Sequence, residues 1–351
     1  MKTIKLMLAA AILISFSYQG LAAKEEFKKT LTKSFDVDKD ALLTLKNKFG
    51  KIHCENWDKN SIAVEVTITV EAKSQENANK YLDRIKVDIS GSRNNVSVVT
   101  DFDDNLFKND NGNVSVDFMI SMPASISIDV DHKFGDLILP EVEGNSKVDL
   151  SYGSIKANKF GGDQNEIDIK FSEGYIGYIK NGQLELKYGE LELDEAGSLN
   201  AESKFSSFKL GKADVLTLDS GYDDDVIGAV RDLDVEGGFS DIEVRSISER
   251  MVADIDYGAL KVKEIGGNFK YVEVTNSFSD ANLGFNPEAS FRISATIKMG
   301  DMTYPRDKAR LNEVELSFTS NKYEGIVGDN ENTSSKVVIE SKNAGVNIFY
   351  R

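Results

Sequence analysis

The chain offers few side chains that could act as catalysts or metal ligands. Its 351 residues include two histidines, His53 and His132, and a single cysteine, Cys54. A Ser-His-Asp triad would need a histidine beside an exposed serine and an aspartate, and no Gly-x-Ser-x-Gly motif occurs. A zinc site would need more histidine or cysteine ligands. We therefore expect no catalytic residues, and we expect Cys54, which alternates with Ile52, to be a buried apolar residue.

An acidic turn is the remaining candidate for ion binding. Asp223, Asp224 and Asp225 are consecutive, and calcium is coordinated by several carboxylate and carbonyl oxygens. The run lacks the glycine placement of an EF-hand loop. A solvated acidic turn explains the same residues, so a weak calcium site and a plain turn both stay open, and no other cofactor is predicted.

A series of aromatic residues is the other group with a binding chemistry. Tyrosines and phenylalanines alternate in it, and exposed rings present large apolar faces on which sugar rings can stack. The tyrosines form a candidate ligand surface: Tyr152, Tyr188, Tyr222 and Tyr257. The phenylalanines are expected to pack in the core: Phe171, Phe205, Phe239 and Phe278.

The same aromatic residues mark an internal repeat. From Tyr152 to Tyr257 the position numbers of successive copies differ by 19, 17, 17, 17, 17 and 18, and the spacing then widens to 21, 21 and 24, ending at Tyr323. Tyrosine copies are followed by Gly or Asp and phenylalanine copies by Ser, which gives a weaker super-period of two copies. Two earlier copies share the pattern: Phe49-Gly50 and Phe134-Gly135.

The segments between the aromatic residues alternate apolar and polar side chains, as in Leu184-Glu185-Leu186 and Ile242-Glu243-Val244. This alternation is typical of β-strands with one face inward, and Gly, Asn, Asp and Ser cluster between them as turns require. One rung cannot bury its apolar face alone, whereas stacked rungs share a continuous core. The sequence therefore predicts an all-β fold, a β-solenoid of short-strand rungs forming a right-handed single-stranded β-helix. An antiparallel meander closed as a sandwich or barrel is the alternative.

The chain divides into three predicted parts. Residues 1–23 have the pattern of a secretory signal peptide, with two lysines, an apolar stretch and small residues at the end. Residues 24–125 are expected to form a β region with one short helix between Gln75 and Ile85, as a cap or a small domain. Residues 126–351 are expected to form the solenoid of β-strand repeats.

The mature chain is strongly acidic and is expected to be exported. The whole sequence carries a formal net charge of −16, and removal of Lys2 and Lys5 with the leader leaves 40 basic against 58 acidic residues, a charge of −18. Nucleic acid would be repelled, and repulsion between acidic faces predicts a monomer. No segment of the mature chain is apolar enough to span a membrane as a helix. We expect the periplasm or cell surface of a Gram-negative-type bacterium.

Several short motifs resemble one bacterial family. They are Leu45-Lys46-Asn47-Lys48-Phe49-Gly50-Lys51-Ile52, Glu55-Asn56-Trp57-Asp58, Phe118-Met119-Ile120-Ser121-Met122-Pro123 and His132-Lys133-Phe134-Gly135-Asp136-Leu137. Together they resemble the exported "putative adhesin" domain family, a domain of unknown function made of β-strand repeats. The resemblance covers most of the mature chain, and it implies a β-helical or β-roll protein at the cell surface or in the periplasm. It carries over no catalytic residues.

Export, repeat architecture and missing catalytic groups together predict a non-enzymatic envelope protein, an adhesin or binding scaffold that presents a repeated β surface. Its partner would be an envelope protein or a glycan. Two alternatives stay open. One is a carbohydrate-active enzyme on a β-helix, which would use paired carboxylates, and the other is a periplasmic protein that binds a protein partner along an open strand edge.

Overall fold

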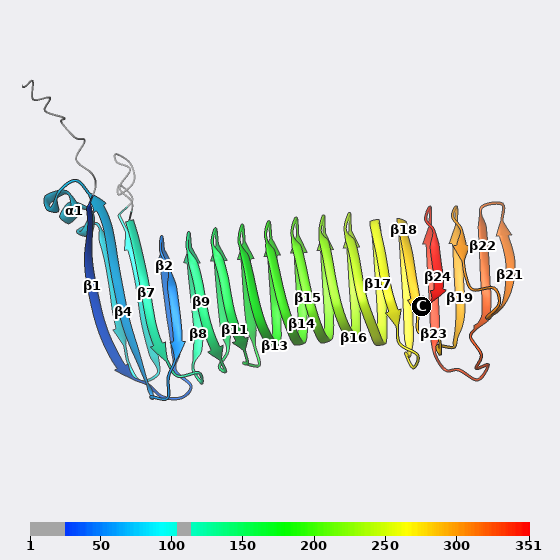
Figure 1. Cartoon of the computed structure of the whole chain (residues 1–351), viewed down its shortest axis with the longest axis horizontal. Helices are drawn as coiled ribbons and strands as arrows, with labels where there is room; N and C mark the ends of the chain where they lie inside the picture. Colours follow the sequence, from blue (N-terminus) through cyan, green and yellow to red (C-terminus); the bar gives the residue numbers. More distant parts are fainter. Residues whose placement is uncertain (1–24, 104–113) are drawn as a thin grey trace, which may run out of the picture.

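The protein is an elongated stack of β-strands in the computed structural model (Figure 1), which describes residues 25–103 and 114–351. The predicted leader, residues 1–23, lies outside the described residues. Within them are 24 strands and one helix, α1 (Gln75–Leu82). Ser74 caps the helix by accepting a hydrogen bond from the Asn77 amide, as N-cap serines do. The short helix predicted between Gln75 and Ile85 is present.

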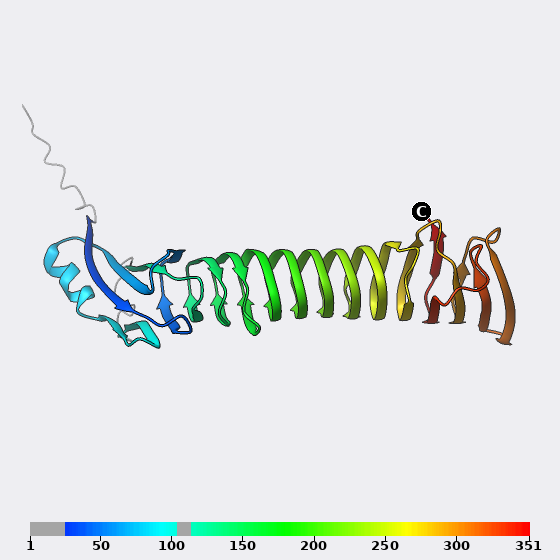
Figure 2. The same ribbon diagram turned by 90° about the horizontal axis from the view of Figure 1, so that it is seen from below.

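Parallel strands wind around the long axis and make the body of the molecule. In the regular middle, each rung is one continuous strand of 15 residues that pairs in parallel with the next rung, as Leu191 does with Phe208. Successive rungs form a regular coil around the long axis (Figure 2). The strands of the body are β8 (Ser127–Lys133), β9 (Asp136–Val142), β10 (Ser146–Ser151), β11 (Ser154–Phe160), β12 (Asn165–Lys170), β13 (Glu173–Lys187), β14 (Glu190–Lys204), β15 (Ser207–Gly221), β16 (Asp224–Gly238), β17 (Asp241–Ile265) and β18 (Tyr271–Phe285).

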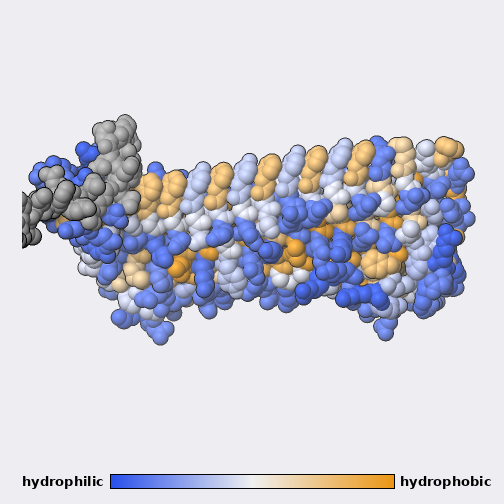
Figure 3. Space-filling view, turned by 45° about the horizontal axis from the view of Figure 1, so that its top comes forward, coloured by the Kyte–Doolittle hydropathy of each residue, from blue (hydrophilic) through white to orange (hydrophobic). Residues whose placement is uncertain are grey.

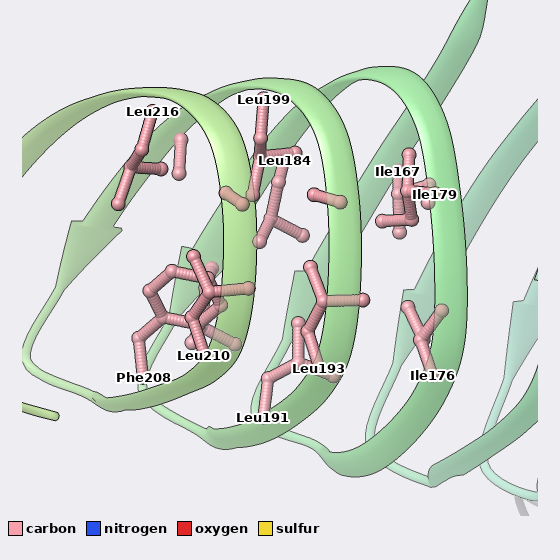
Figure 4. Packing of buried hydrophobic residues seen from close by; sticks show 14 of the residues in the cluster. Ile167, Ile176, Ile179, Leu184, Leu191, Leu193, Leu199, Phe208, Leu210 and Leu216 are labelled. Carbon is pink, nitrogen blue, oxygen red and sulfur yellow. The ribbon is translucent and has the colours of Figure 1, made fainter. Parts of the chain in front are cut away.

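Each rung has two halves, and their inward side chains meet in a narrow core (Figure 4). In β14, Leu191 and Leu193 point inward from the first half, and Leu199 and Ala201 point inward from the second. Two exposed residues in a row, Asp194 and Glu195, interrupt the alternation where the strand bends between the halves. Full burial of one leucine stabilises the fold by about 1.5–3 kcal/mol, so stacked rungs supply the core that a single rung lacks. The predicted β-solenoid is confirmed.

Both ends are closed by a rung that is out of chain order. At the N-terminal end, β2 (Leu42–Lys48) pairs with β8 on one side and β6 (Asn95–Phe102) on the other, while β3 (Ile52–Asn56) pairs with β9 and β7 (Val114–Met122). At the C-terminal end, β23 (Lys336–Lys342) lies between β18 and β19 (Phe291–Lys298). Similarly, β24 (Val346–Tyr350) lies between β18 and β20 (Met302–Thr303). The last strands of the chain are therefore an internal rung.

Antiparallel strands cover the two outermost rungs. The N-terminal cap consists of β1 (Glu25–Asp36), β4 (Ser61–Ala72), β5 (Ile85–Gly91), β6, β7 and the helix α1. The C-terminal cap is a hairpin of β21 (Ala309–Ser317) and β22 (Ser320–Val327), with β22 paired to β19. Tyr323 lies buried in β22, so the prediction that it marks a further rung is wrong. The domain boundary predicted at residue 125 stays a prediction.

Candidate functional site

The aromatic residue of every rung sits at the same turn and has the same unusual backbone. Its φ lies between 49° and 63°, in the left-handed region, which costs a non-glycine residue about 1–2 kcal/mol. The turn still continues the sheet, because the Tyr188 amide donates to the Lys204 carbonyl of the next rung. Asn343 and Met299 hold the equivalent positions at the C-terminal end, and asparagine is among the residues that tolerate this conformation best.

Ten aromatic rings stack along this edge in one row, which we call the aromatic ladder. Successive ring centroids lie 4.8–5.2 Å apart and the ring planes are nearly parallel. Stacked pairs contribute about 0.5–1.5 kcal/mol each, which offsets part of the backbone strain. The ladder consists of Phe49, Phe134, Tyr152, Phe171, Tyr188, Phe205, Tyr222, Phe239, Tyr257 and Phe278.

The ladder is exposed over most of its length. From Phe134 to Phe278 its residues retain 43–56% of their accessible surface. They form a ridge along one edge, in which strongly hydrophobic residues (orange) alternate with less hydrophobic ones (pale) (Figure 3). The prediction that the phenylalanine copies are core residues is wrong, because the left-handed turn directs both aromatic types outward: Phe171, Phe205, Phe239 and Phe278. The four candidate tyrosines lie in the same ridge: Tyr152, Tyr188, Tyr222 and Tyr257.

Stacking decides which parts of the rings a ligand could contact. Each inner ring is covered on both faces by its neighbours, as Tyr188 is by rings at 4.9 and 5.2 Å, so a sugar cannot stack face to face on it. Ring edges and tyrosine hydroxyl groups remain, with a tyrosine on every second rung. A glycan would therefore meet a ridge of apolar edges and regularly spaced hydroxyls. The role of the four tyrosines as a ligand surface stays a prediction.

Close packing of the turns explains the alternation of Gly and Ser after the aromatic residue. A Cβ at Gly189 would lie 2.2 Å from the Ser172 carbonyl oxygen of the neighbouring rung, so only glycine fits there. In the next rung the Ser206 hydroxyl accepts a hydrogen bond from the Gly189 amide at 3.3 Å. Ser172 does the same for Gly153 at 3.0 Å. The super-period of two copies is therefore a pairing of rungs through their turns.

A row of carboxylates runs beside the ladder, three positions before eight of its ten aromatic residues. Part of it lines a shallow groove of about 550 Å³ on the outer face of the second half-rungs. The row has one acid per rung over eight rungs: Asp131, Asp149, Asp168, Glu185, Glu202, Asp219, Glu236 and Asp254.

Lysines two positions further along neutralise the middle of this row. Lys170 lies 2.6 Å from Asp168 and 3.6 Å from Glu185, so it joins two rungs. Lys187 in turn contacts Glu185 and Glu202. These ion pairs, together with that of Lys204, hold the pKa of Glu185 and of Glu202 below the usual range. A carboxylate pair of this kind has no group poised to act as a general acid.

Asp149 and Asp254 are exceptions in the row. Burial raises the pKa of Asp149, and the neighbouring charges of Asp168 and Asp131 raise it further. Burial and the charge of Asp256 raise the pKa of Asp254. Asp149 is nevertheless one member of a regular row rather than half of a distinct pair. The row was not predicted from the sequence, in which the aromatic residues are the more conspicuous mark of the repeat. The sequence does contain the signal, as an acid three positions before eight of the ten ladder residues.

The three aspartates at the Tyr222 turn do not share one centre. Asp223 and Asp225 are buried, at 4% and 1% exposure, whereas Asp224 is exposed on the other side of the strand. The Ser220 hydroxyl donates to both buried carboxylates, at 3.3 Å to Asp223 and 2.6 Å to Asp225. Burial raises the pKa of both, to about 7 for Asp225. These hydrogen bonds stabilise the turn from its buried side.

Of the cysteine and the two histidines, Cys54 and His132 are enclosed in the core. Cys54 is buried, as predicted, and burial raises the pKa of its thiol to about 12, far from a reactive thiolate. His132 is fully buried beside the Asn47 carbonyl, and burial lowers its pKa. His53 is half-buried in β3. In the described residues, no three acidic, histidine or cysteine side chains come together to hold a metal ion, and no helix is long and apolar enough to cross a membrane.

Comparison with known proteins gives structural neighbours only. No family model and no curated protein matches the chain. A "putative adhesin" from Bacteroides fragilis NCTC 9343 is 12% identical, with 92% of this chain and 97% of that chain covered and a TM-score of 0.28. A "putative lipid binding protein" from Parabacteroides distasonis ATCC 8503 is 11% identical, with 91% and 96% covered and a TM-score of 0.30.

A third neighbour is a "putative cell adhesion protein" from Clostridium sporogenes ATCC 15579, which is 12% identical, with 93% of this chain and 100% of that chain covered and a TM-score of 0.20. Descriptions as an adhesin or a cell adhesion protein recur among the solved structures that align with most of this chain. Because the TM-scores are low, the function of this chain is inferred from its own geometry.

Proposed function

We propose that this protein is an exported, non-enzymatic binding scaffold of the bacterial cell envelope, an adhesin in the broad sense. The aromatic ladder carries the proposal. It is one continuous ridge of half-exposed apolar edges on a chain of net charge −16. Contiguous exposed apolar surface of this kind marks interaction sites in soluble proteins.

The regularity of the surface supports an extended partner. The ladder and the carboxylate row repeat in register from rung to rung, and lysines accompany them on the three adjacent rungs of Lys170, Lys187 and Lys204, so similar contacts are offered many times along the axis. A linear glycan or an extended envelope protein could use several copies at once, and avidity then replaces tight binding at one site. The glycosidase alternative is less well supported, since lysines lower the pKa of the carboxylates in the middle of the row.

A bead-retention assay tests the proposal. Beads coated with the mature chain are counted on surfaces that carry isolated cell-envelope polysaccharide or isolated envelope protein. In the test variant, four adjacent ladder residues are replaced by asparagine, the residue that the chain itself uses at position 343: Tyr188→Asn, Phe205→Asn, Tyr222→Asn and Phe239→Asn.

The control variant is Met299→Asn, which changes the same type of turn outside the row of stacked rings. Circular dichroism first establishes that both variants are folded. We expect retention of the wild type and of the control, and a loss of retention for the variant with four replacements. Absence of retention on both surfaces, or equal retention of all three proteins, would show that the ladder is not a binding surface.

A further inference from the structure

A pocket at the C-terminal end of the solenoid differs from the rest of this acidic surface. It has a volume of about 440 Å³ and lies on the outer face of the first half-rungs, where β17, β18 and β24 run side by side. Three cationic side chains, two amides and one aromatic ring line it, and no acidic side chain does: Lys261, Lys263, Arg351, Asn282, Asn347 and Phe349.

The floor of the pocket is apolar because an aromatic ring covers a glycine. Phe349 pairs directly with Gly284 on the neighbouring strand. A Cβ at Gly284 would lie 3.0 Å from the Phe349 ring, so the ring occupies the space that a side chain would take. The ring keeps 36% of its accessible surface. Unlike the rings of the ladder, it has no stacked neighbours among the described residues.

Amide groups form one wall. The Thr303 hydroxyl donates to the Asn347 side-chain oxygen at 2.6 Å, and the Asn347 amide nitrogen donates to the Asn282 oxygen at 3.3 Å. This series of hydrogen bonds ends at Asn282, whose side-chain nitrogen can donate to a ligand. Fixed amides of this kind recognise hydroxyl groups, which both donate and accept.

The opposite wall carries an excess of positive charge. Lys261 lies 3.2 Å from Glu243, and Lys263 contacts the same carboxylate. Two ammonium groups therefore share one carboxylate, and one of the two positive charges is not neutralised. Arg351 is paired with Glu264 at 3.3 Å and adds no net charge. An anionic group placed between the two lysines would complete the pair.

We propose that this pocket binds a saccharide unit that carries a carboxylate. The apolar floor would contact the ring of the sugar, the amides its hydroxyl groups and the two lysines its carboxylate. The proposal deepens the function proposed above and rests on it, since it names a class of glycan and gives the repeated surface an end site.

The test uses the full mature chain, residues 24–351, titrated with a galacturonate trisaccharide, with cellotriose as its neutral counterpart, and with inorganic phosphate. Binding is followed by calorimetry at low salt. The test variant is the pair Lys261→Gln and Lys263→Gln. Lys209→Gln is the control, because Lys209 is likewise an exposed lysine paired with a glutamate, Glu190, and lies outside the pocket.

We expect the wild type to bind galacturonate more tightly than cellotriose, and the double variant to lose at least about tenfold in affinity for galacturonate, as removal of charged hydrogen bonds does. Lys209→Gln should leave the affinity unchanged. Equal binding by wild type and double variant, or phosphate binding as tight as galacturonate binding, would overturn the proposal. If galacturonate fails to bind while coated beads are still retained through the ladder, the pocket is refuted and the scaffold function stands.

Discussion

Replacement of Asp225 by asparagine should make the solenoid more stable at alkaline pH. Asp225 is 1% exposed and accepts hydrogen bonds from the Ser220 hydroxyl and the Phe208 amide. Burial raises its pKa from 3.8 to about 7, and the charge of Asp223 adds to the effect. The folded chain therefore holds a proton on Asp225 that the unfolded chain releases near pH 4. Its contribution to stability is fully present below that pH and is lost as pH rises toward 7.

The magnitude follows from the two pKa values. One pKa unit corresponds to about 1.4 kcal/mol, so the difference between 3.8 and about 7 destabilises the folded chain by about 4 kcal/mol above neutral pH. Asparagine has the shape of the protonated acid. Its oxygen can accept from the Phe208 amide and its amide nitrogen can donate to the Ser220 hydroxyl, so the variant keeps both contacts without the charge.

The assay is urea unfolding followed by circular dichroism, at about pH 5 and about pH 8.5, on either side of the raised pKa. Between these two pH values the wild type should lose about 3 kcal/mol more than Asp225→Asn does, because the first part of the loss has already occurred at pH 5. The matched control is Asp224→Asn, because Asp224 is the exposed neighbour in the same turn. If wild type and Asp225→Asn show the same pH dependence, the buried carboxylate does not carry the proton that the geometry assigns to it.

Three further predictions concern the turns, the closing rung and the oligomeric state. Gly189→Ala should destabilise the fold by about 2–3 kcal/mol, because the new Cβ would lie 2.2 Å from the Ser172 carbonyl oxygen. Gly238→Ala should be close to neutral, because a Cβ there would have no atom within 4 Å. Equal melting temperatures for the two variants would contradict this. Deletion of residues 336–351 removes β23 from between β18 and β19, and β24 from between β18 and β20. Limited proteolysis with mass spectrometry should then show cleavage in residues 286–335, and full protection there would refute the role of the closing rung. Sedimentation equilibrium should find a monomer because acidic faces repel one another, and a stable dimer would exclude that expectation.

The repeat could be predicted from the sequence because each rung is formed by residues that are close together in the chain. Alternation of apolar and polar residues specifies the inward side chains, and the aromatic residue marks each turn. Cys54 was correctly placed in the core by the same alternation. The phenylalanines were misplaced because hydrophobicity favours burial, whereas the left-handed backbone of Phe205 turns its side chain outward. Backbone conformation at a single residue is not visible in composition.

Other features depend on contacts between distant segments. β2 and β3 stack on β8 and β9, which come much later in the chain, and β23 inserts between β18 and β19. The regular spacing of the aromatic residues gives no sign of either arrangement. The pocket around Phe349 arises only because β24 lies beside Gly284. The carboxylate row, in contrast, was visible in the sequence, since an acid stands three positions before most of the repeated aromatic residues.

The proposed adhesin function requires this solenoid to present its repeated surface to the outside of the cell. Intact cells are treated with a membrane-impermeant, amine-reactive biotin reagent, which reaches exposed lysines such as Lys212 at 62% side-chain exposure. We predict that the protein is labelled while a periplasmic control protein is not. Labelling of this protein only after the outer membrane has been opened would contradict the account, and would instead favour a periplasmic partner protein.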